Sequence, residues 1–133
     1  MSQNASLRVL VVDDYEDSAE MLSILLQRWG YEVKTAYDGQ SGLELMKEWQ
    51  PEVALLDIGM PGMDGYEVAR RIRQMTGIGE RAYLVALTGY GNDEAVRRAH
   101  DAGFNSHLLK PIDSNRLQSL LGSLPVNAPA AGT

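Results

Sequence analysis

Short apolar runs alternate along this chain with longer segments in which apolar and polar positions are mixed. A short apolar run rich in β-branched residues is typical of a strand that is buried on both faces of a sheet. The run at 7–12 is the clearest example. We expect five strands, at 7–12, 31–36, 53–56, 82–87 and 104–109.

In the segments between these runs, apolar residues recur at the three- and four-residue spacing of one helix face. The first helix is marked by Leu22, Leu25, Leu26 and Trp29, and Gly30 ends it. We expect further helices at 39–49, around 68–75, at 93–100 with Ala95, Val96 and Ala99 facing inward, and from Asp113 or Ser114 onward. Five arginines of the third and fourth helices are expected on solvated faces: Arg70, Arg71, Arg73, Arg97 and Arg98.

Five strand–helix units in succession indicate a doubly wound α/β fold, in which a parallel sheet carries helices on both faces. Right-handed crossovers leave few topologies for a chain of this length. Ligands of such sheets bind beyond the carboxyl ends of the strands. The polar residues at those ends are therefore the first candidates for function.

The composition fits one folded domain. The 133 residues match the usual domain size of about 100–150, and we assign 7–124 to the domain, 1–6 to an N-terminal extension and 125–133 to a flexible tail or linker remnant. The net charge of −6 disfavours a nucleic-acid partner. The chain has no cysteine, which excludes disulfides and Cys-ligated metals. With no secretory signal and no long apolar run, we expect a cytoplasmic protein without membrane contact.

Four of the five expected strands end in residues suited to phosphate or metal chemistry. Asp13 and Asp14 follow the first strand, Asp57 the third, Thr88 the fourth and Lys110 the fifth. Each has an ordinary explanation when taken alone, as a helix cap, a turn residue or a solvated charge. Together at one edge of the sheet they favour a shared site. If the first and third strands are neighbours, three carboxylates converge, and such an all-oxygen cluster suits a hard cation such as Mg²⁺.

Four motifs around these residues carry a family resemblance. They are Val-Val-Asp-Asp at 11–14, the segment 55–65 that begins Leu-Leu-Asp, Ala-Leu-Thr-Gly at 86–89 and Leu-Leu-Lys-Pro at 108–111. Over about residues 7–122 the chain resembles the receiver domains of two-component response regulators, and 57–73 looks most like receivers of hybrid sensor histidine kinases. The resemblance implies a flavodoxin-like (βα)5 fold with strand order 2-1-3-4-5.

The resemblance also implies roles for the strand-end residues. Asp57 would be the phosphoacceptor, taking a phosphoryl group from the phosphohistidine of a histidine kinase or phosphotransfer protein. Mg²⁺, or Mn²⁺ in its place, would be held by Asp14 and Asp57, by Asp13 through water and by the carbonyl of Gly59. A carboxylate is a competent nucleophile, and phosphoryl transfer depends mainly on positioning and charge neutralisation.

The remaining implied roles concern the phosphorylated state. Lys110, before a cis Pro111, and Thr88 would contact the phosphoryl oxygens. Thr88 would then switch a partner-binding face made by the fourth helix, the fifth strand and the fifth helix. The family's usual aromatic switch position holds His107 here, so a switch role and an exposed strand-end role are equally open for it. Tyr90 is a second candidate, for partner contact or for limiting access to the phosphate.

Two other function classes remain as alternatives. A haloacid-dehalogenase-like phosphotransferase would need a second Asp two positions after the nucleophile, where this chain has Gly59. A flavodoxin-like cofactor binder lacks support, because no glycine-rich dinucleotide fingerprint or Walker loop occurs. We therefore expect a phosphorylation switch and not a turnover enzyme. It is either a single-domain receiver or a receiver from a longer protein such as a hybrid histidine kinase.

Overall fold

The structure, a computed structural model, describes residues 7–124. Its five strands form one parallel sheet with the order β2-β1-β3-β4-β5, as predicted. The strands are β1 (Arg8–Val12), β2 (Glu32–Ala36), β3 (Val53–Asp57), β4 (Tyr83–Thr88) and β5 (Ser106–Leu109). The three central strands are almost wholly buried, which explains their nearly continuous apolar sequence.

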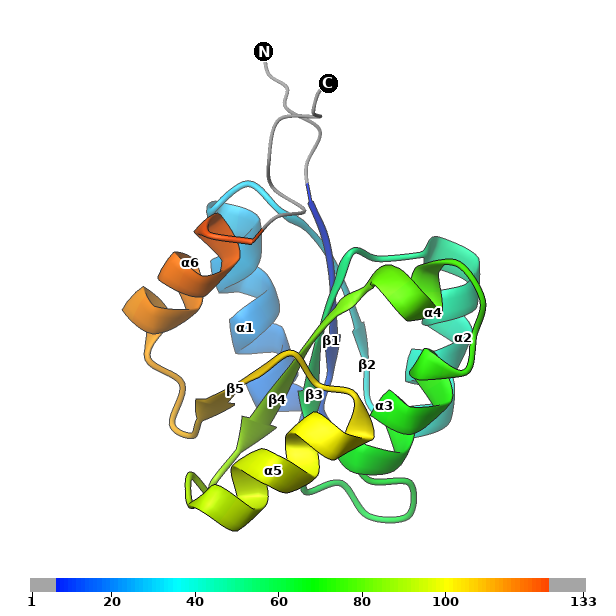
Figure 1. Cartoon of the computed structure of the whole chain (residues 1–133). Coiled ribbons are helices and arrows are strands. Elements are labelled where there is room, and N and C mark those ends of the chain that lie inside the picture. The colour runs from blue at the N-terminus through cyan, green and yellow to red at the C-terminus, as the bar shows by residue number, and fades with distance from the viewer. Residues whose placement is uncertain (1–6, 125–133) are drawn as a thin grey trace.

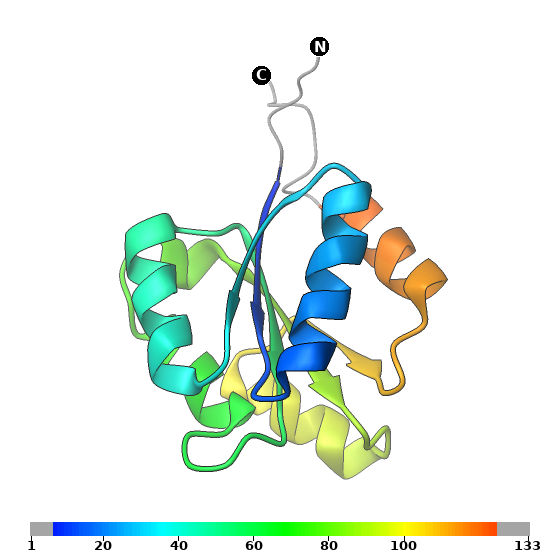
Figure 2. The ribbon, with the colours of Figure 1, turned by 180° about the vertical axis from the view of Figure 1, so that it is seen from behind.

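Helices cover both faces of the sheet (Figures 1 and 2). They are α1 (Glu16–Arg28), α2 (Gly39–Trp49), α3 (Gly65–Arg73), α4 (Ile78–Arg81), α5 (Asp93–Ala102) and α6 (Ser114–Gly122). One apolar core packs α1 and α6 against the sheet, and a second packs α2, α3, α4 and α5 against the opposite face. This arrangement is the doubly wound α/β fold that the sequence predicts. In the described part of the chain no helix is long and apolar enough to span a bilayer.

The direction of the strands decides where the two ends of the described chain lie. β1 begins and α6 ends at one end of the molecule, and the carboxyl ends of the strands point to the opposite end (Figure 1). Residues that follow a strand therefore gather on the side away from both ends of the described chain.

Polar side chains begin four of the helices. Asp38, Asp64, Asn92 and Asp113 each accept a hydrogen bond from a backbone N–H in the first turn of α2, α3, α5 and α6, respectively. This contact satisfies donors that the helix itself leaves free. The prediction that the last helix begins at Asp113 or Ser114 is confirmed, with Asp113 as the cap.

The periodicity was misleading in the helix from Asp93. Val96 was expected to face inward, but it is 36% exposed, and only Ala99 and Ala102 of α5 are buried. The reason is that α5 packs on the core mainly through its C-terminal half. The sequence also does not predict α4, because four residues are too few to show a helical period. α3 ends at Arg73, so Met75 lies beyond it, although it still packs against the core.

One of the five arginines that were expected on solvated faces, Arg73, makes specific partly buried contacts instead, while Arg98 is exposed as expected and also contacts an aromatic ring. Arg73 is half-buried at the end of α3, and its guanidinium donates to the carbonyl oxygens of Gly103, Gly79 and Ala82 and to Oδ1 of Asn105, at 2.8–3.1 Å. Arg73 thus joins α3, α4, the start of β4 and the turn after α5. Arg98 of α5 lies 4.2 Å from the centre of the Tyr66 ring on α3, a cation–π contact between these helices.

Candidate functional site

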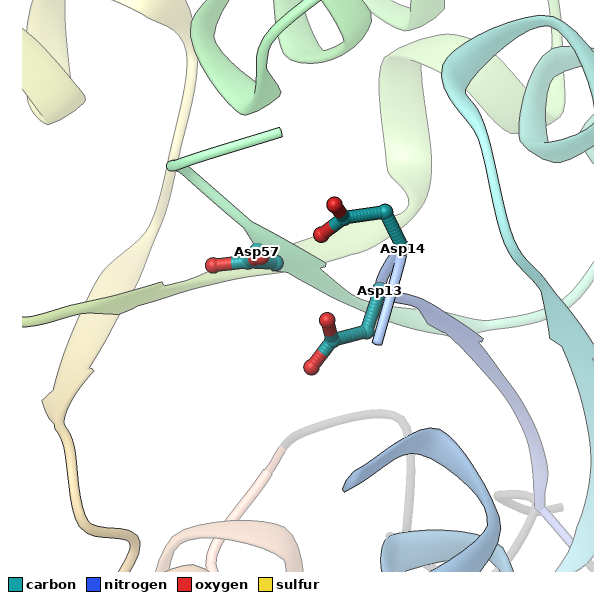
Figure 3. A group of neighbouring side chains, drawn as sticks. All are labelled: Asp13, Asp14 and Asp57. Atoms are coloured by element: carbon teal, nitrogen blue, oxygen red, sulfur yellow. The ribbon is translucent and has the colours of Figure 1, made fainter. Parts of the chain in front are cut away.

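Three carboxylates meet at the carboxyl end of the sheet. Asp13 and Asp14 follow β1, and Asp57 ends β3, the strand that pairs with β1. One oxygen from each of the three groups lies within 4.8 Å of the others. Figure 3 shows the three carboxylates directed to the same side of the strand ends. The predicted convergence of these residues therefore follows directly from the strand order.

The backbone around the cluster holds these side chains in place. The N–H of Tyr15 donates to Asp13 Oδ1 at 3.0 Å, and the N–H of Gly59 donates to Asp57 Oδ1 at 3.3 Å. Neither Asp13 nor Asp14 caps α1, because Tyr15 occupies that position without a side-chain cap bond. The ordinary capping explanation for these two residues is therefore wrong.

Gly65 allows the first turn of α3 to press against the end of β3. A Cβ at this position would lie 2.5 Å from the carbonyl oxygen of Asp57, a distance that real Cβ atoms do not reach. Any larger residue would push α3 away from the strand that carries Asp57. The sequence shows this glycine only as one of several in a loop, so its packing role could not be read from the motif.

Lys110 reaches the cluster from the loop after β5. Its Nζ lies 2.6 Å from Asp57 Oδ1, while Asp57 is only 5% exposed. The peptide between Lys110 and Pro111 is cis, as predicted. The ammonium group of the lysine therefore offsets part of the negative charge of the three carboxylates.

Thr88 ends β4, the other neighbour of β3, and is buried. Its Oγ1 accepts a hydrogen bond from the N–H of Tyr90 at 3.0 Å, so its present contact is local. The Tyr90 side chain is 70% exposed, and His107 is half-buried on β5. The structure thus places both switch candidates, and their roles stay predictions.

Negative charge exceeds positive charge in this pocket. Burial raises the pKa of Asp13, and the nearby Asp57 carboxylate raises it further, against the lowering effect of the Tyr15 N–H and Lys110. Two like charges 4.8 Å apart repel by about 3.5 kcal/mol at an effective dielectric of 20. The donor set is all oxygen, which fits Mg²⁺, and a divalent cation bound there would offset the negative charge of the three carboxylates.

The raised pKa of Asp13 leads to a stability prediction. Because the folded protein holds the Asp13 proton more tightly than the unfolded chain, the stability contributed by this group is present at low pH and is lost as pH rises through the raised pKa. In chelator at neutral pH, Asp13→Asn should therefore raise the free energy of unfolding, since Asn keeps an acceptor for the Tyr15 N–H.

Urea unfolding of the wild type and Asp13→Asn between acid and neutral pH measures this effect. The gain should vanish as pH falls and the wild-type carboxyl becomes protonated. A constant difference at every pH would contradict an electrostatic origin.

An apolar groove that the sequence pattern does not predict adjoins the cluster. Its volume is about 340 Å³, and Asp13 and Lys110 lie at its border. Most of the remaining lining comes from α1 and the loop before α6: Ser18, Met21, Leu22, Leu25, Pro111 and Ile112. Met21, a large apolar residue outside the buried stripe of α1, is the one sequence signal that could have indicated it.

Comparison with known proteins identifies the family. The response regulator receiver domain family matches this chain over residues 9–122.

The chain belongs to the response regulator receiver domain family. Receiver domains are components of two-component signalling. Each of the four motifs on which the resemblance rested begins inside one of the strands that carry the site, and the motif at 55–65 continues to the start of α3.

The relatives of this receiver domain include both short and long proteins. The virulence sensor protein BvgS of Bordetella pertussis is 36% identical over 127 residues, covering 92% of this chain but only 10% of BvgS. The match covers 92% of one short curated relative but only 10% of BvgS, so some relatives are far longer than this chain.

Solved structures of receivers have the same fold. The chemotaxis protein CheY4 of Vibrio cholerae has a TM-score of 0.84 at 31% identity, covering 89% of this chain and 98% of that one. The receiver domain of the sensor histidine kinase PA1611 from Pseudomonas aeruginosa has a TM-score of 0.79 at 28% identity, covering 88% and 95%. That structure has a magnesium ion coordinated in its active-site cleft.

Proposed function

We propose that this receiver domain accepts a phosphoryl group on Asp57 from a phosphohistidine, with Mg²⁺ bound beside it, and that phosphorylation changes the binding of a partner protein. The observation that carries the proposal is the convergence of Asp13, Asp14 and Asp57 with Lys110 at one pocket. A purely structural role would not require three acids within 4.8 Å of one another.

Each residue of the pocket has a task in this reaction. An oxygen of Asp57 forms a bond to phosphorus while the bond from phosphorus to the histidine nitrogen breaks, and its electron pair leaves with the imidazole. Lys110, which already donates a hydrogen bond to Asp57, would neutralise negative charge on the phosphoryl oxygens. The Thr88 hydroxyl would donate a hydrogen bond to one of these oxygens.

The metal would be held by Asp14, Asp57 and Asp13, with the Gly59 carbonyl as a further oxygen ligand. When bound, Mg²⁺ neutralises negative charge between the attacking carboxylate and the phosphoryl group. A Cβ at Gly59 would lie 4.0 Å from Asp57 Oδ1 and meet no nearer atom, so the space beside Asp57 is uncrowded at this position.

The donor is proposed to be a helical histidine kinase or phosphotransfer protein. To deliver a phosphohistidine to Asp57, it must cover the mouth of the pocket, and the apolar groove beside Asp13 and Lys110 gives it a surface to contact. Met21, at 73% exposure, is suited to such a contact because methionine adapts to the shape of a partner.

The face that binds the partner protein is proposed to be formed by α5, β5 and α6. Phosphorylation adds about −1.5 to −2 charges, and Thr88 would exchange its local bond to Tyr90 for one to the phosphate. β4 pairs Thr88 with Leu109 of β5, so a movement of Thr88 is transmitted to the strand that carries His107. We propose that His107 and Tyr90 report this movement to the partner.

The test is phosphorylation of the purified chain by a small donor. Incubation with acetyl phosphate and Mg²⁺, followed by intact mass, should show one added phosphoryl group. Excess chelator should abolish the addition, and Mn²⁺ should restore it. Modification that proceeds equally well in chelator would overturn the metal-dependent mechanism.

A further inference from the structure

Leu109 lies where β4, β5 and the loop before α5 meet. It is the last residue of β5, and its Cα is paired in register with that of Thr88, the last residue of β4. The Leu109 residue is 43% exposed, whereas the neighbouring Leu108 is buried in the core beneath α1 and α6. An apolar side chain with this exposure adds little to the core, so its role depends on what it contacts at the surface.

The Leu109 side chain packs against the loop that joins β4 to α5. A Cβ at Gly91 would lie 3.0 Å from Cδ2 and 3.1 Å from Cδ1 of Leu109, which is closer than most Cβ contacts. Gly91 does not have a positive φ, so the backbone conformation does not require glycine at this position. It is the contact with Leu109 that leaves little room for a larger residue.

The same loop is hydrogen-bonded to Thr88. The Thr88 hydroxyl accepts a hydrogen bond from the Tyr90 N–H at 3.0 Å and donates one to the Tyr90 carbonyl oxygen at 3.4 Å. A hydroxyl has a single proton, so the bond to this carbonyl must break if Thr88 donates to a phosphoryl group on Asp57. The loop is therefore held by hydrogen bonds to Thr88 and by apolar contact with Leu109.

A movement of this loop would reach α5 directly. Asn92 follows Gly91 and caps the helix, since its Oδ1 accepts a hydrogen bond from the Ala95 N–H at 2.8 Å. The buried residues of α5 are Ala99 and Ala102, both in the second half of the helix. The start of α5 can therefore follow the loop while the end of the helix stays packed on the core.

We propose that Leu109 is a positioning residue that holds the loop at 89–91 in its unphosphorylated arrangement and so determines how readily modification of Asp57 alters α5. This inference rests on the proposed function, because it requires Thr88 to bind a phosphoryl group. The contact between Leu109 and Gly91 is lost when the loop moves, and its loss opposes the rearrangement. A shorter side chain at 109 raises the population of the rearranged state. By linkage, the pocket then binds a phosphoryl analogue more tightly.

Titration with beryllofluoride in excess Mg²⁺ tests this role at equilibrium, because this anion bonds to a carboxylate oxygen in the place of a phosphoryl group. Leu109→Ala should lower the dissociation constant by at least about twofold, the lower end of what single substitutions do to coupling between sites. Without beryllofluoride, the NMR amide signals of 89–95 in Leu109→Ala should shift toward their positions in the bound wild type. Leu109→Met, whose side chain still reaches Gly91, should restore the wild-type values.

Thr88→Ala separates coupling from a merely structural effect. Without the Thr88 hydroxyl the loop no longer responds to the bound anion, so adding Leu109→Ala to Thr88→Ala should leave the dissociation constant unchanged. An equal gain in affinity with and without the hydroxyl would overturn the coupling role.

Ile24→Ala is the matched control, because Ile24 is an aliphatic residue with 55% exposure on α1. It should bind beryllofluoride with the wild-type dissociation constant. Equal dissociation constants for the wild type and Leu109→Ala would overturn the coupling role of Leu109 alone. A wild-type chain that binds no beryllofluoride would overturn the proposed function and, with it, this inference.

Discussion

Asp57→Asn should abolish phosphoryl uptake from acetyl phosphate. The amide oxygen of Asn is a far weaker nucleophile than a carboxylate, and Asn removes one of the three negative groups that would hold Mg²⁺. We expect no added phosphoryl group by intact mass over a period in which the wild type is fully modified. Loss of the attacking group should lower the rate by more than about a thousandfold.

Asp64→Asn is the control for this experiment. Asp64 lies at the end of the loop that follows Asp57 and caps α3 by accepting a hydrogen bond from the Glu67 N–H, a role that Asn performs equally well. The Asp64→Asn variant should be phosphorylated at the wild-type rate. If Asp57→Asn retained the added mass, another residue would be the acceptor, and Asp13 and Asp14 would be the next to replace.

Arg73→Met should cause a large loss of stability. The guanidinium of Arg73 donates to four acceptors that belong to three separate parts of the chain. Burial lowers the pKa of this group, but arginine remains protonated at neutral pH. Hydrogen bonds from a charged donor contribute about 1.5–3 kcal/mol each, and their loss leaves buried carbonyl oxygens without a partner. We expect the free energy of unfolding to fall by about 2–4 kcal/mol.

Urea unfolding of Arg73→Met beside Arg71→Met measures this effect. Arg71 is exposed and forms a surface ion pair with Glu67, so its replacement should cost less than about 1 kcal/mol. Arg73→Lys should also be destabilised, because an ammonium group cannot reproduce the planar fork of guanidinium donors. Equal stability of the Arg73→Met and Arg71→Met variants would show that the network is not important for folding.

The contrast between these two sites shows what the sequence could predict. Asp13, Asp57 and Lys110 were found because each follows a recognisable strand, and parallel strands bring their carboxyl ends to one edge. The role of Arg73 was hidden, because its acceptors are mostly backbone carbonyls, one of them 30 residues away. A backbone acceptor leaves no mark on the pattern of residue types.

The same reasoning applies to the helices. α2 was predicted with its observed bounds, because its apolar positions follow a helical period from Gly39 to Trp49. Val96 was misplaced, because the period describes an amphipathic face and does not say how much of that face reaches the core. The groove beside α1 depends on the spacing between a helix and a loop, which no local pattern encodes.

The two ends of the described chain lie opposite the acidic pocket, and this placement has a consequence for larger assemblies. β1 starts and α6 finishes on the side remote from Asp57 (Figure 1). A neighbouring domain attached at either point would lie at the end of the receiver remote from Asp57. It would leave the end that carries Asp57 accessible to a phosphodonor. The fold can thus be inserted into sensor proteins of very different architecture without rebuilding its reactive surface.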